Sequence, residues 1–403
     1  MGRRREEDLS AGPLARGARR GTGGTEMPAG SPRERFRSIA SPLRTAAGLV
    51  AGLLVLAGCA SAPKPAAGPE PAFFPPPPDP PRVQFLFAIT SEEDIPGFRR
   101  SLAERLAGEA ETHILVRPRG VAVRDGVIYV ADAKLATVLR IDLDAKRFEP
   151  IDHQGPGKLS GPLGISFDED GVLYVADRGR RQVVAFAPDA EGRLAWSRAY
   201  GESETLLPTD VVARNGRLYV TDISDHEIEV YDIASGERVG TLGREGEDPG
   251  EFKFPSFIAL GPDDTLYVTD TMNFRVQKLT LDGEPLGSYG KAGDWTGSVS
   301  RPKGVAVDDD GFVHILDAGF ENAQIFLPDG RVGTFYGGYG NYPGHMYLPF
   351  EIALDKSLLP RLRDRVSPRL VPKYVILVTN QAGPHKLNVY VFGEPAAGAD
   401  GGS

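Results

Sequence analysis

The stretch Asp170–Asp177 reads DGVLYVAD, and closely similar octapeptides occur four more times in the chain. They are DGVIYVAD at Asp125–Asp132, NGRLYVTD at Asn215–Asp222, DDTLYVTD at Asp263–Asp270 and DGFVHILD at Asp310–Asp317. Each copy begins with residues typical of a tight turn and continues with the alternating apolar pattern of a β-strand. One hairpin unit is therefore repeated along the chain, as in propellers and solenoids.

The repeat has a regular period. A proline opens each unit, at spacings of 44 to 47 residues: Pro118, Pro162, Pro208, Pro255, Pro302 and Pro349. Each unit contains three or four short apolar runs separated by Asp- and Gly-rich turns, which indicates a four-stranded antiparallel sheet. Six such units over residues 82–394 predict an all-β, six-bladed β-propeller, with residues 395–403 as a disordered tail.

The repeat resembles the NHL repeat, in the form found in bacterial lipoproteins, and the resemblance covers about residues 118–393. It implies that the octapeptide is the second strand of a blade. We expect its closing Asp to accept backbone N–H groups of nearby loops, as Asx turns do. In the last unit Asn380 replaces this Asp and can make the same bonds.

The last unit lacks a fourth strand. An alternating segment without a partner of its own, VQFLFAI at Val83–Ile89, lies upstream of the first unit. We expect it to close the ring as the outer strand of blade six. Joining chain ends about 300 residues apart costs about 5 kcal/mol in loop entropy. Burial of its apolar side chains, at about 1.5–3 kcal/mol each, should exceed that cost. A short amphipathic helix is expected over Phe98–Glu111.

The amino-terminal region indicates export. Residues 1–58 read as a leader and signal peptide, with Met27 as a possible true start. Leu56-Ala57-Gly58-Cys59 resembles the bacterial lipobox, which implies cleavage before Cys59 and acylation of that cysteine. Residues 59–81 would be the lipidated Cys59 and a Pro-rich linker without sheet ladders. Ala60 after the cysteine suggests sorting to the outer membrane, facing the periplasm.

Charge narrows the possible partners. The chain has 46 basic and 55 acidic residues; without residues 1–58, 36 and 50 remain. An acidic body argues against nucleic acid and against adsorption on anionic lipid, so the lipid anchor would be its sole membrane contact. A monomer that binds an envelope protein or a glycan is the expectation. The exception is a basic insertion over residues 355–373, which could meet an acidic partner or could be a solvated loop.

The residues after each opening proline should surround the mouth of the central channel. Asp210 and Glu351 replace the Gly of the repeat there and would face the channel. They are interpreted either as a site for a polar ligand or cation, or as two solvated carboxylates. The candidate binding residues at this mouth are Arg119, Asp210, Arg275, Lys303, Glu351 and Asn380.

Aromatic side chains mark a second candidate surface. The loop Tyr336–Tyr347 contains four Tyr, and Trp295 lies in a loop on the same face. Trp295, Tyr339 and Tyr342 are the candidates for stacking on sugars or gripping a partner. Packing of the loop against blade six is the alternative.

No catalytic residue is predicted. The six His show no paired ligand spacing, and no nucleophile elbow or phosphate loop occurs. The first hypothesis is therefore a lipid-anchored binding scaffold without a cofactor. The alternative is a metal-dependent hydrolase or lyase, similar to gluconolactonases or amidating lyases, with one divalent ion held by Asp210, Glu351 and Asn380. An accessory role in electron transfer comes only from similar lipoproteins.

Overall fold

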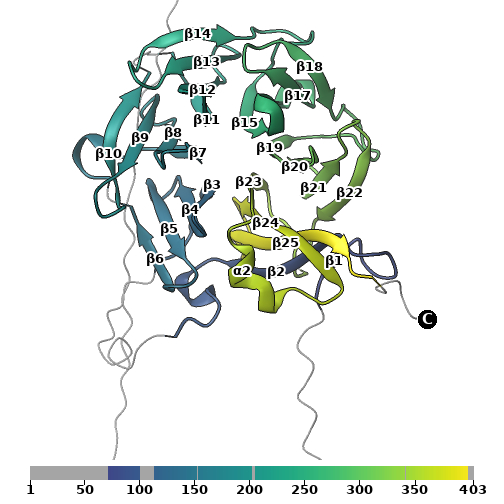
Figure 1. Ribbon diagram of the computed structural model, residues 1–403. Helices are drawn as coiled ribbons and strands as arrows, with labels where there is room; N and C mark the ends of the chain where they lie inside the picture. Colours follow the sequence, from purple (N-terminus) through teal and green to yellow (C-terminus); the bar gives the residue numbers. More distant parts are fainter. Residues whose placement is uncertain (1–70, 100–112, 152, 202–204, 341, 398–403) are drawn as a thin grey trace, which may run out of the picture. The chain divides into compact units, whose positions relative to one another are not determined.

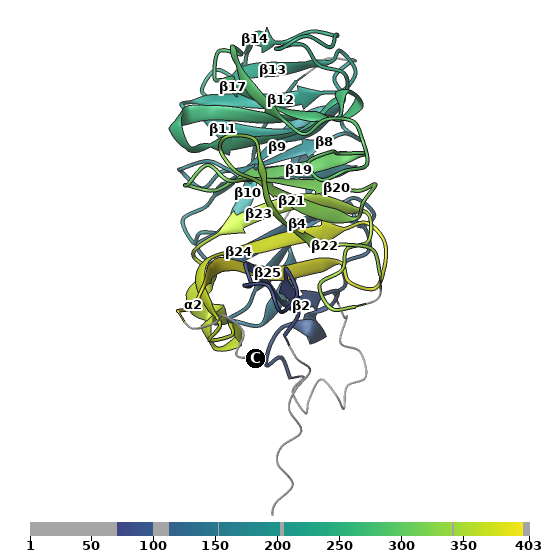
Figure 2. The ribbon, with the colours of Figure 1, turned by 90° about the vertical axis from the view of Figure 1, so that its right-hand side faces the viewer.

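The computed structural model describes residues 71–99, 113–151, 153–201, 205–340 and 342–397. Figure 1 looks along the axis of a ring of six antiparallel sheets, and Figure 2 shows the ring from its side. Five sheets have four strands and the sixth has five. The predicted all-β, six-bladed propeller of four-stranded antiparallel blades is thus confirmed. No helix in the described ranges is long and apolar enough to cross a bilayer.

The first five blades follow the chain from the axis outward. Blade one contains β3 (Pro118–Arg124), β4 (Val127–Asp132), β5 (Thr137–Asp142) and β6 (Arg147–Pro150). Blade two contains β7 (Pro162–Phe167), β8 (Leu173–Asp177), β9 (Gln182–Pro188) and β10 (Leu194–Tyr200). Blade three contains β11 (Pro208–Arg214), β12 (Arg217–Asp222), β13 (Glu227–Asp232) and β14 (Arg238–Leu242). Blade four contains β15 (Pro255–Gly261), β16 (Thr265–Asp270), β17 (Arg275–Thr280) and β18 (Pro285–Tyr289). Blade five contains β19 (Pro302–Val307), β20 (Val313–Asp317), β21 (Asn322–Phe326) and β22 (Val332–Gly337).

Blade six joins the two ends of the propeller. It contains β23 (Pro349–Asp355), β24 (Leu370–Asn380) and β25 (Leu387–Pro395), and its next strand is β2 (Val83–Ile89). Val83 pairs with Phe392 and Ile89 with Leu387, so the predicted closure is confirmed. A bulge between Phe85 and Phe87 shifts the alternation. As a result Val83 and Ile89 are fully buried, while Phe85 and Phe87 are partly exposed.

The sixth sheet contains one strand that the sequence did not predict. β1 (Phe73–Phe74) pairs with β2, with Phe73 opposite Gln84 and Phe74 opposite Val83. The expectation that residues 60–81 form no sheet ladder is therefore wrong for these two phenylalanines. The physical reason is that Phe73 is buried beneath the Arg369 guanidinium, which lies 5.2 Å from its ring.

The octapeptide forms β4, β8, β12, β16 and β20, and its alternation builds the interfaces between blades. In β4, Ile128 and Val130 pack in a cluster shared with blade six, whereas Tyr129 and Ala131 pack in one shared with blade two. Equivalent clusters fill the other interfaces. The core is thus divided into six layers between blades, and each second strand supplies two of them.

The closing Asp accepts backbone amides of two loops in four of the five octapeptides, as predicted, whereas Asp270 accepts the Lys253 amide of the preceding loop and the side chain of Asn273 after its own strand. Asp317 accepts the amides of Ser300 and Arg301 in the preceding inter-blade loop, at 2.6 and 3.1 Å. It also accepts those of Gly319 and Phe320 after its own strand, at 2.7 and 3.1 Å. Asp132 binds four amides in the same pattern. These carboxylates hold the inter-blade loops in place.

The basic insertion of blade six forms α2 (Leu359–Leu362) and a 3-10 turn, and three of its six basic side chains form ion pairs with other blades. Arg361 pairs with Asp144 at 2.7 Å, Lys356 pairs with Asp309, and Lys373 pairs with Asp310 at 3.1 Å. It is therefore a paired rim element of the ring. The leader, Cys59 and most of the helix expected at Phe98–Glu111 lie outside the described residues.

Candidate functional site

Two aromatic rings lie in contact at the mouth of the channel on the side of the inter-blade loops. Phe257 of β15 and Phe350 of β23 come from the inner strands of blades four and six, and their ring centroids are 5.0 Å apart. We call these two residues the aromatic pair. The guanidinium of Arg119 lies 4.4 Å from the Phe350 ring, and the ammonium of Lys303 lies 5.9 Å from the Phe257 ring. Two predicted mouth residues are thus cations stacked on this pair.

Burial lowers the pKa of both cations. Desolvation, followed by the nearby charge of Arg117, lowers the pKa of Arg119 to about 10. Desolvation and the neighbouring Arg301 and Arg119 lower the pKa of Lys303. The Arg119 side chain also donates a hydrogen bond to Gln381. The mouth layer is therefore positively charged and closely packed.

Beyond the aromatic pair, a cavity of about 300 Å³ occupies the channel. Its lining starts at the third residue of β11 and β23 and continues to the hairpin ends of the inner strands, where Val123, Phe167 and Leu260 are partly exposed. Apart from Ser166, Asp210 and Glu351, every lining residue is Val, Ala, Ile, Leu or Phe. We call this space the channel cavity. It lies toward the hairpins, whereas the sequence placed the site at the opposite mouth.

Asp210 and Glu351, the carboxyl pair, lie at the polar end of the channel cavity and are only 4% and 6% exposed. Asp210 accepts the amide of Val211 at 2.8 Å and that of Ile258, in the next blade, at 2.9 Å. Glu351 accepts the amide of Ile352 at 3.2 Å through Oε1, while its Oε2 is buried without a hydrogen-bond partner. The interpretation as two solvated carboxylates is wrong, because both side chains are buried and three of their four oxygens accept backbone amides.

Burial shifts the protonation of the carboxyl pair. Desolvation raises the pKa of Asp210 to about 7, against the opposing effect of its two amide bonds. Desolvation, followed by the charge of Asp210, raises the pKa of Glu351 well above its usual value. The two groups therefore affect each other across the ring and together retain protons near neutral pH.

Two glycines make room for the carboxyl pair, and sequence reasoning missed their role. A Cβ at Gly164 would lie 2.0 Å from Oδ1 of Asp210, and a Cβ at Gly304 would lie 2.9 Å from Oε1 of Glu351. Each glycine belongs to the blade before its acid. The signal in the sequence was the pairing of a Gly in one unit with an acid at the same position of the next.

Two other predicted mouth residues serve elsewhere in the fold. Asn380 accepts the amide of Tyr347 of the preceding inter-blade loop at 3.0 Å, as the Asp of other blades does. It also donates to the carbonyl of His385 at 3.0 Å, a bond that an Asp carboxylate cannot make, so the prediction that it makes the same bonds is confirmed only for the first. Arg275 forms an ion pair of 2.9 Å with Asp270 and donates to two carbonyls of the loop before β15. Neither lines the channel cavity.

The predicted aromatics divide between a cleft and a loop. Trp295 is 66% exposed and lines a cleft of about 230 Å³, the aromatic cleft, with Phe335, Phe320 and Asn322 of blade five. Tyr339 and Tyr342 are exposed in the loop after β22, where His345 contacts both. Tyr336 of the same loop sequence is instead part of β22 and fully buried.

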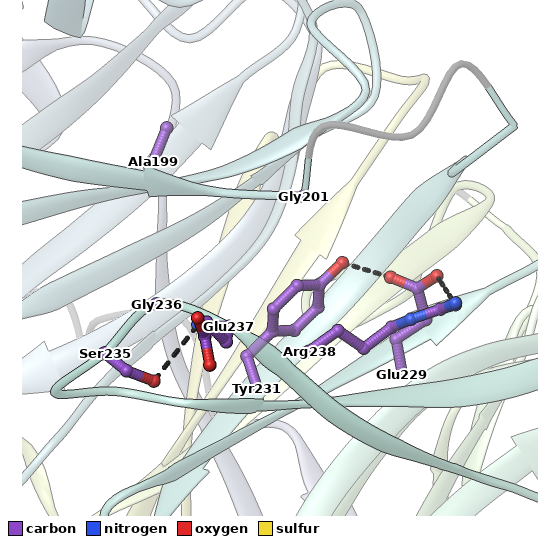
Figure 3. Close-up of a pocket in the computed structure, with 8 residues that line it drawn as sticks. All are labelled: Ala199, Gly201, Glu229, Tyr231, Ser235, Gly236, Glu237 and Arg238. Carbon is purple, nitrogen blue, oxygen red and sulfur yellow. Dashed lines mark hydrogen bonds and ion pairs between the residues drawn. The ribbon is translucent and has the colours of Figure 1, made fainter.

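Another cavity, of about 400 Å³, lies at the rim between blades two and three (Figure 3). Its buried Glu229 accepts hydrogen bonds from the Tyr231 hydroxyl and, at 2.9 Å, from Arg238. Both carboxylate oxygens of Glu229 are thus engaged within the protein. These polar groups satisfy one another, which is what a structural network requires.

The fold and the channel define this protein as a six-bladed propeller with an apolar, carboxyl-bearing channel. The family model described as "SMP-30/Gluconolactonase/LRE-like region" matches residues 120–336, and the chain belongs to this family. The resemblance to the NHL repeat stays a prediction.

Three similar proteins each have low sequence identity to this chain. Peptidylglycine alpha-amidating monooxygenase of Rattus norvegicus is 27% identical over 221 residues, which are 49% of this chain and 22% of that protein. The chain thus matches about a fifth of that relative's length. A Bacteroides thetaiotaomicron protein of unknown function has a TM-score of 0.53 at 16% identity, covering 77% of this chain and 75% of its own. An auxiliary nutrient binding protein of Bacteroides ovatus has a TM-score of 0.51 at 14% identity, covering 68% and 69%. These two likenesses concern the fold.

A divalent ion in the channel, which the enzyme alternative requires, does not fit the donors present. Within the described ranges no group of three or more His, Cys, Asp or Glu side chains could hold a metal ion. Three of the four oxygens of the carboxyl pair already accept backbone amides. Hard cations such as Ca²⁺ require six to eight oxygen ligands. The apolar walls cannot supply them.

Proposed function

We propose that this protein is a binding propeller of the bacterial cell envelope that holds a neutral glycan in the aromatic cleft. It would be anchored through acylated Cys59, on the periplasmic side of the outer membrane, and act as a monomer. The lipobox and the acidic charge of the body support this location and argue against nucleic acid as a partner. The observation that carries the glycan proposal is the fixed, exposed Trp295 beside polar groups.

The loop that presents Trp295 is held rigid. The Ser298 amide donates to the Trp295 carbonyl at 2.8 Å, closing a turn around the tryptophan. Gln324 of β21 accepts the Gly297 amide at 3.1 Å and donates to the Ser298 carbonyl at 2.7 Å. A loop whose backbone is held by hydrogen bonds binds with a smaller entropy cost, because its backbone needs no ordering on contact.

The chemistry of the aromatic cleft suits a sugar ring. Trp295 and Phe335, which is 57% exposed, offer flat apolar surfaces on which the C–H face of a sugar can pack. Asn322 lines the same cleft, and its Oδ1 is buried without a hydrogen-bond partner, so it can accept a sugar hydroxyl. The net charge of −9 disfavours polyanionic glycans. A neutral oligosaccharide is therefore the proposed ligand.

Family membership and the amidating relatives support the alternative, a metal-dependent hydrolase or lyase. The carboxyl pair does not supply the ligand set that such an enzyme would need, and Asn380 is engaged elsewhere. We therefore keep the binding function as the proposal and the metal-dependent enzyme as its alternative.

Tryptophan fluorescence provides the test, since the chain has two tryptophans, Trp196 and Trp295. In the full chain with Trp196→Phe, Trp295 becomes the sole reporter. Neutral oligosaccharides prepared from envelope polysaccharides should change its emission saturably. Trp295→Ala, measured by calorimetry, should bind at least tenfold more weakly, a loss of about 1.4 kcal/mol. Equal affinity of the wild type and Trp295→Ala, or no saturable change with any neutral oligosaccharide, would refute the proposal.

A further inference from the structure

The carboxyl pair lacks a counterion. Among the described residues neither Asp210 nor Glu351 forms an ion pair, and no basic group contributes to the pKa shift of either. Arg119 and Lys303, the cations of the mouth, are stacked on the aromatic pair. They do not line the channel cavity. Buried charges in proteins are normally paired or coordinate an ion. Once the carboxyl pair loses a proton, the channel cavity therefore has a negative charge without a positive partner among the described residues.

Two acceptors in the channel cavity are unsatisfied. Oε2 of Glu351 and Oγ of Ser166 are both buried without a hydrogen-bond partner, and both residues line the cavity. An unsatisfied buried polar atom costs about 1–3 kcal/mol, and such atoms are uncommon in native structures. A ligand with several N–H donors would satisfy both.

The remaining wall of the channel cavity is apolar and leads toward the hairpins. Its volume, about 300 Å³, is at the lower end of the range for small-molecule pockets. Because the lining reaches the hairpin ends of the inner strands and the aromatic pair lies at the opposite side, we expect a ligand to enter from the hairpin end. Its polar group would come to rest at the carboxyl pair, and its apolar part would lie along residues such as Ile165 and Val305.

We propose that the channel cavity is a binding site for a small organic amine, with the ammonium group on Asp210 and Glu351 and an apolar body along the inner strands. An ammonium has three donors and one positive charge, which match the unsatisfied acceptors and the missing counterion. A bare divalent ion matches less well, since the walls offer no further oxygen ligands. The site is independent of the aromatic cleft and of its proposed glycan.

The test uses calorimetry on the full chain with hexylammonium, and compares it with 1-hexanol, hexanoate and calcium chloride. We expect one site per chain at pH 8, with hexylammonium bound at least tenfold more tightly than 1-hexanol. Protonation of the carboxyl pair removes the negative charge, so affinity should fall at least tenfold between pH 8 and pH 5. Asp210 and Glu351 are the titratable groups that line the cavity.

Variants locate the site. Glu351→Gln keeps the size of the side chain and should weaken hexylammonium binding at least tenfold. Ala353→Phe should block the cavity without changing a charge, which covers the case that Glu351→Gln fails to fold. Trp295→Ala, in the aromatic cleft, should bind the amine as the wild type does. Equal binding of hexylammonium and 1-hexanol, binding of calcium alone, no binding, or full affinity in Glu351→Gln would each overturn the proposal.

Discussion

At the scale of single residues, one side chain in each blade performs the same task. The closing Asp of the octapeptide accepts a backbone amide of the preceding inter-blade loop, and in most blades it also accepts amides of the loop after its own strand. Asn380 accepts the amide of the preceding loop through Oδ1 and reaches the following loop by donating to a carbonyl, so the link between the two loops does not require a charge. This explains why the same residue type recurs without forming a metal site.

His314 is the residue that departs most from the octapeptide, since it replaces the central Tyr. It is fully buried in β20, with Nδ1 3.2 Å from the Tyr336 hydroxyl and Nε2 3.0 Å from that of Tyr374. Tyr374 donates its proton to Asp308 at 2.9 Å, so Nε2 of His314 must be the protonated nitrogen. The imidazole is therefore neutral, and desolvation lowers its pKa to about 3.

This burial predicts an acid sensitivity. The unfolded chain takes up a proton at His314 below a pH of about 6.5, whereas the native state does so only near pH 3. The free energy of unfolding should therefore fall as pH decreases from 6.5 toward 3, with a contribution from His314 of up to about 1.36 kcal/mol per pH unit. Urea unfolding of the wild type and of His314→Phe between pH 7.5 and 4.5 measures it.

The contribution should disappear in His314→Phe and persist in Tyr336→Phe, which removes a hydrogen bond but no group that titrates in this range. An identical pH slope in the wild type and in His314→Phe would show that the imidazole is not buried in its neutral form.

At the scale of elements, the inner strands contain the polar and aromatic residues of the channel, and β2 closes the ring. All six inner strands begin with a proline and have a register shift just after it. That irregular segment is where Asp210, Glu351 and the aromatic pair occur. The residues just after the opening proline, where strand pairing is irregular, are thus the ones whose side chains differ between blades.

Deleting residues 83–89 tests the closure. Val83 and Ile89 are fully buried in two different inter-blade clusters, so the loss of β2 exposes both neighbours of blade six. We expect the cooperative thermal transition to be lost, which differential scanning calorimetry would detect. A chain without residues 398–403 is the matched control and should melt as the wild type does. A deletion variant with an unchanged transition would contradict closure by β2.

At the scale of the whole molecule, the anchor and the acidic body should act separately. Cys59→Ala would remove the site of acylation, so the protein should move from the membrane fraction to the soluble periplasmic fraction. A lipid anchor with two or three acyl chains binds a membrane almost permanently. Fractionation after a wash in high salt, together with metabolic labelling by a fatty-acid analogue, measures this. Membrane retention of Cys59→Ala, or its release by salt, would argue against the anchor.

Local sequence patterns predicted the ring, whereas the contacts between blades could be identified only from the structure. The six opening prolines predicted the number of blades, and the unpaired Val83–Ile89 predicted the closure, because each signal is visible in a single stretch of sequence. The aromatic pair joins residues 257 and 350, and three of the insertion's six basic side chains pair with Asp144, Asp309 and Asp310 of other blades. β1 was missed because its two phenylalanines lie in a Pro-rich stretch. The aromatic contact at the mouth and the channel cavity depend on such long-range contacts.

The way β2 completes the ring has a consequence for biogenesis. Its partner β25 is made about 300 residues later, which at roughly 5–20 residues per second takes about 15–60 s. During that interval an apolar edge strand stays uncovered while five blades accumulate behind it, a condition that promotes aggregation. Production of this protein should therefore depend on chaperones that shield the early strand until the late one arrives.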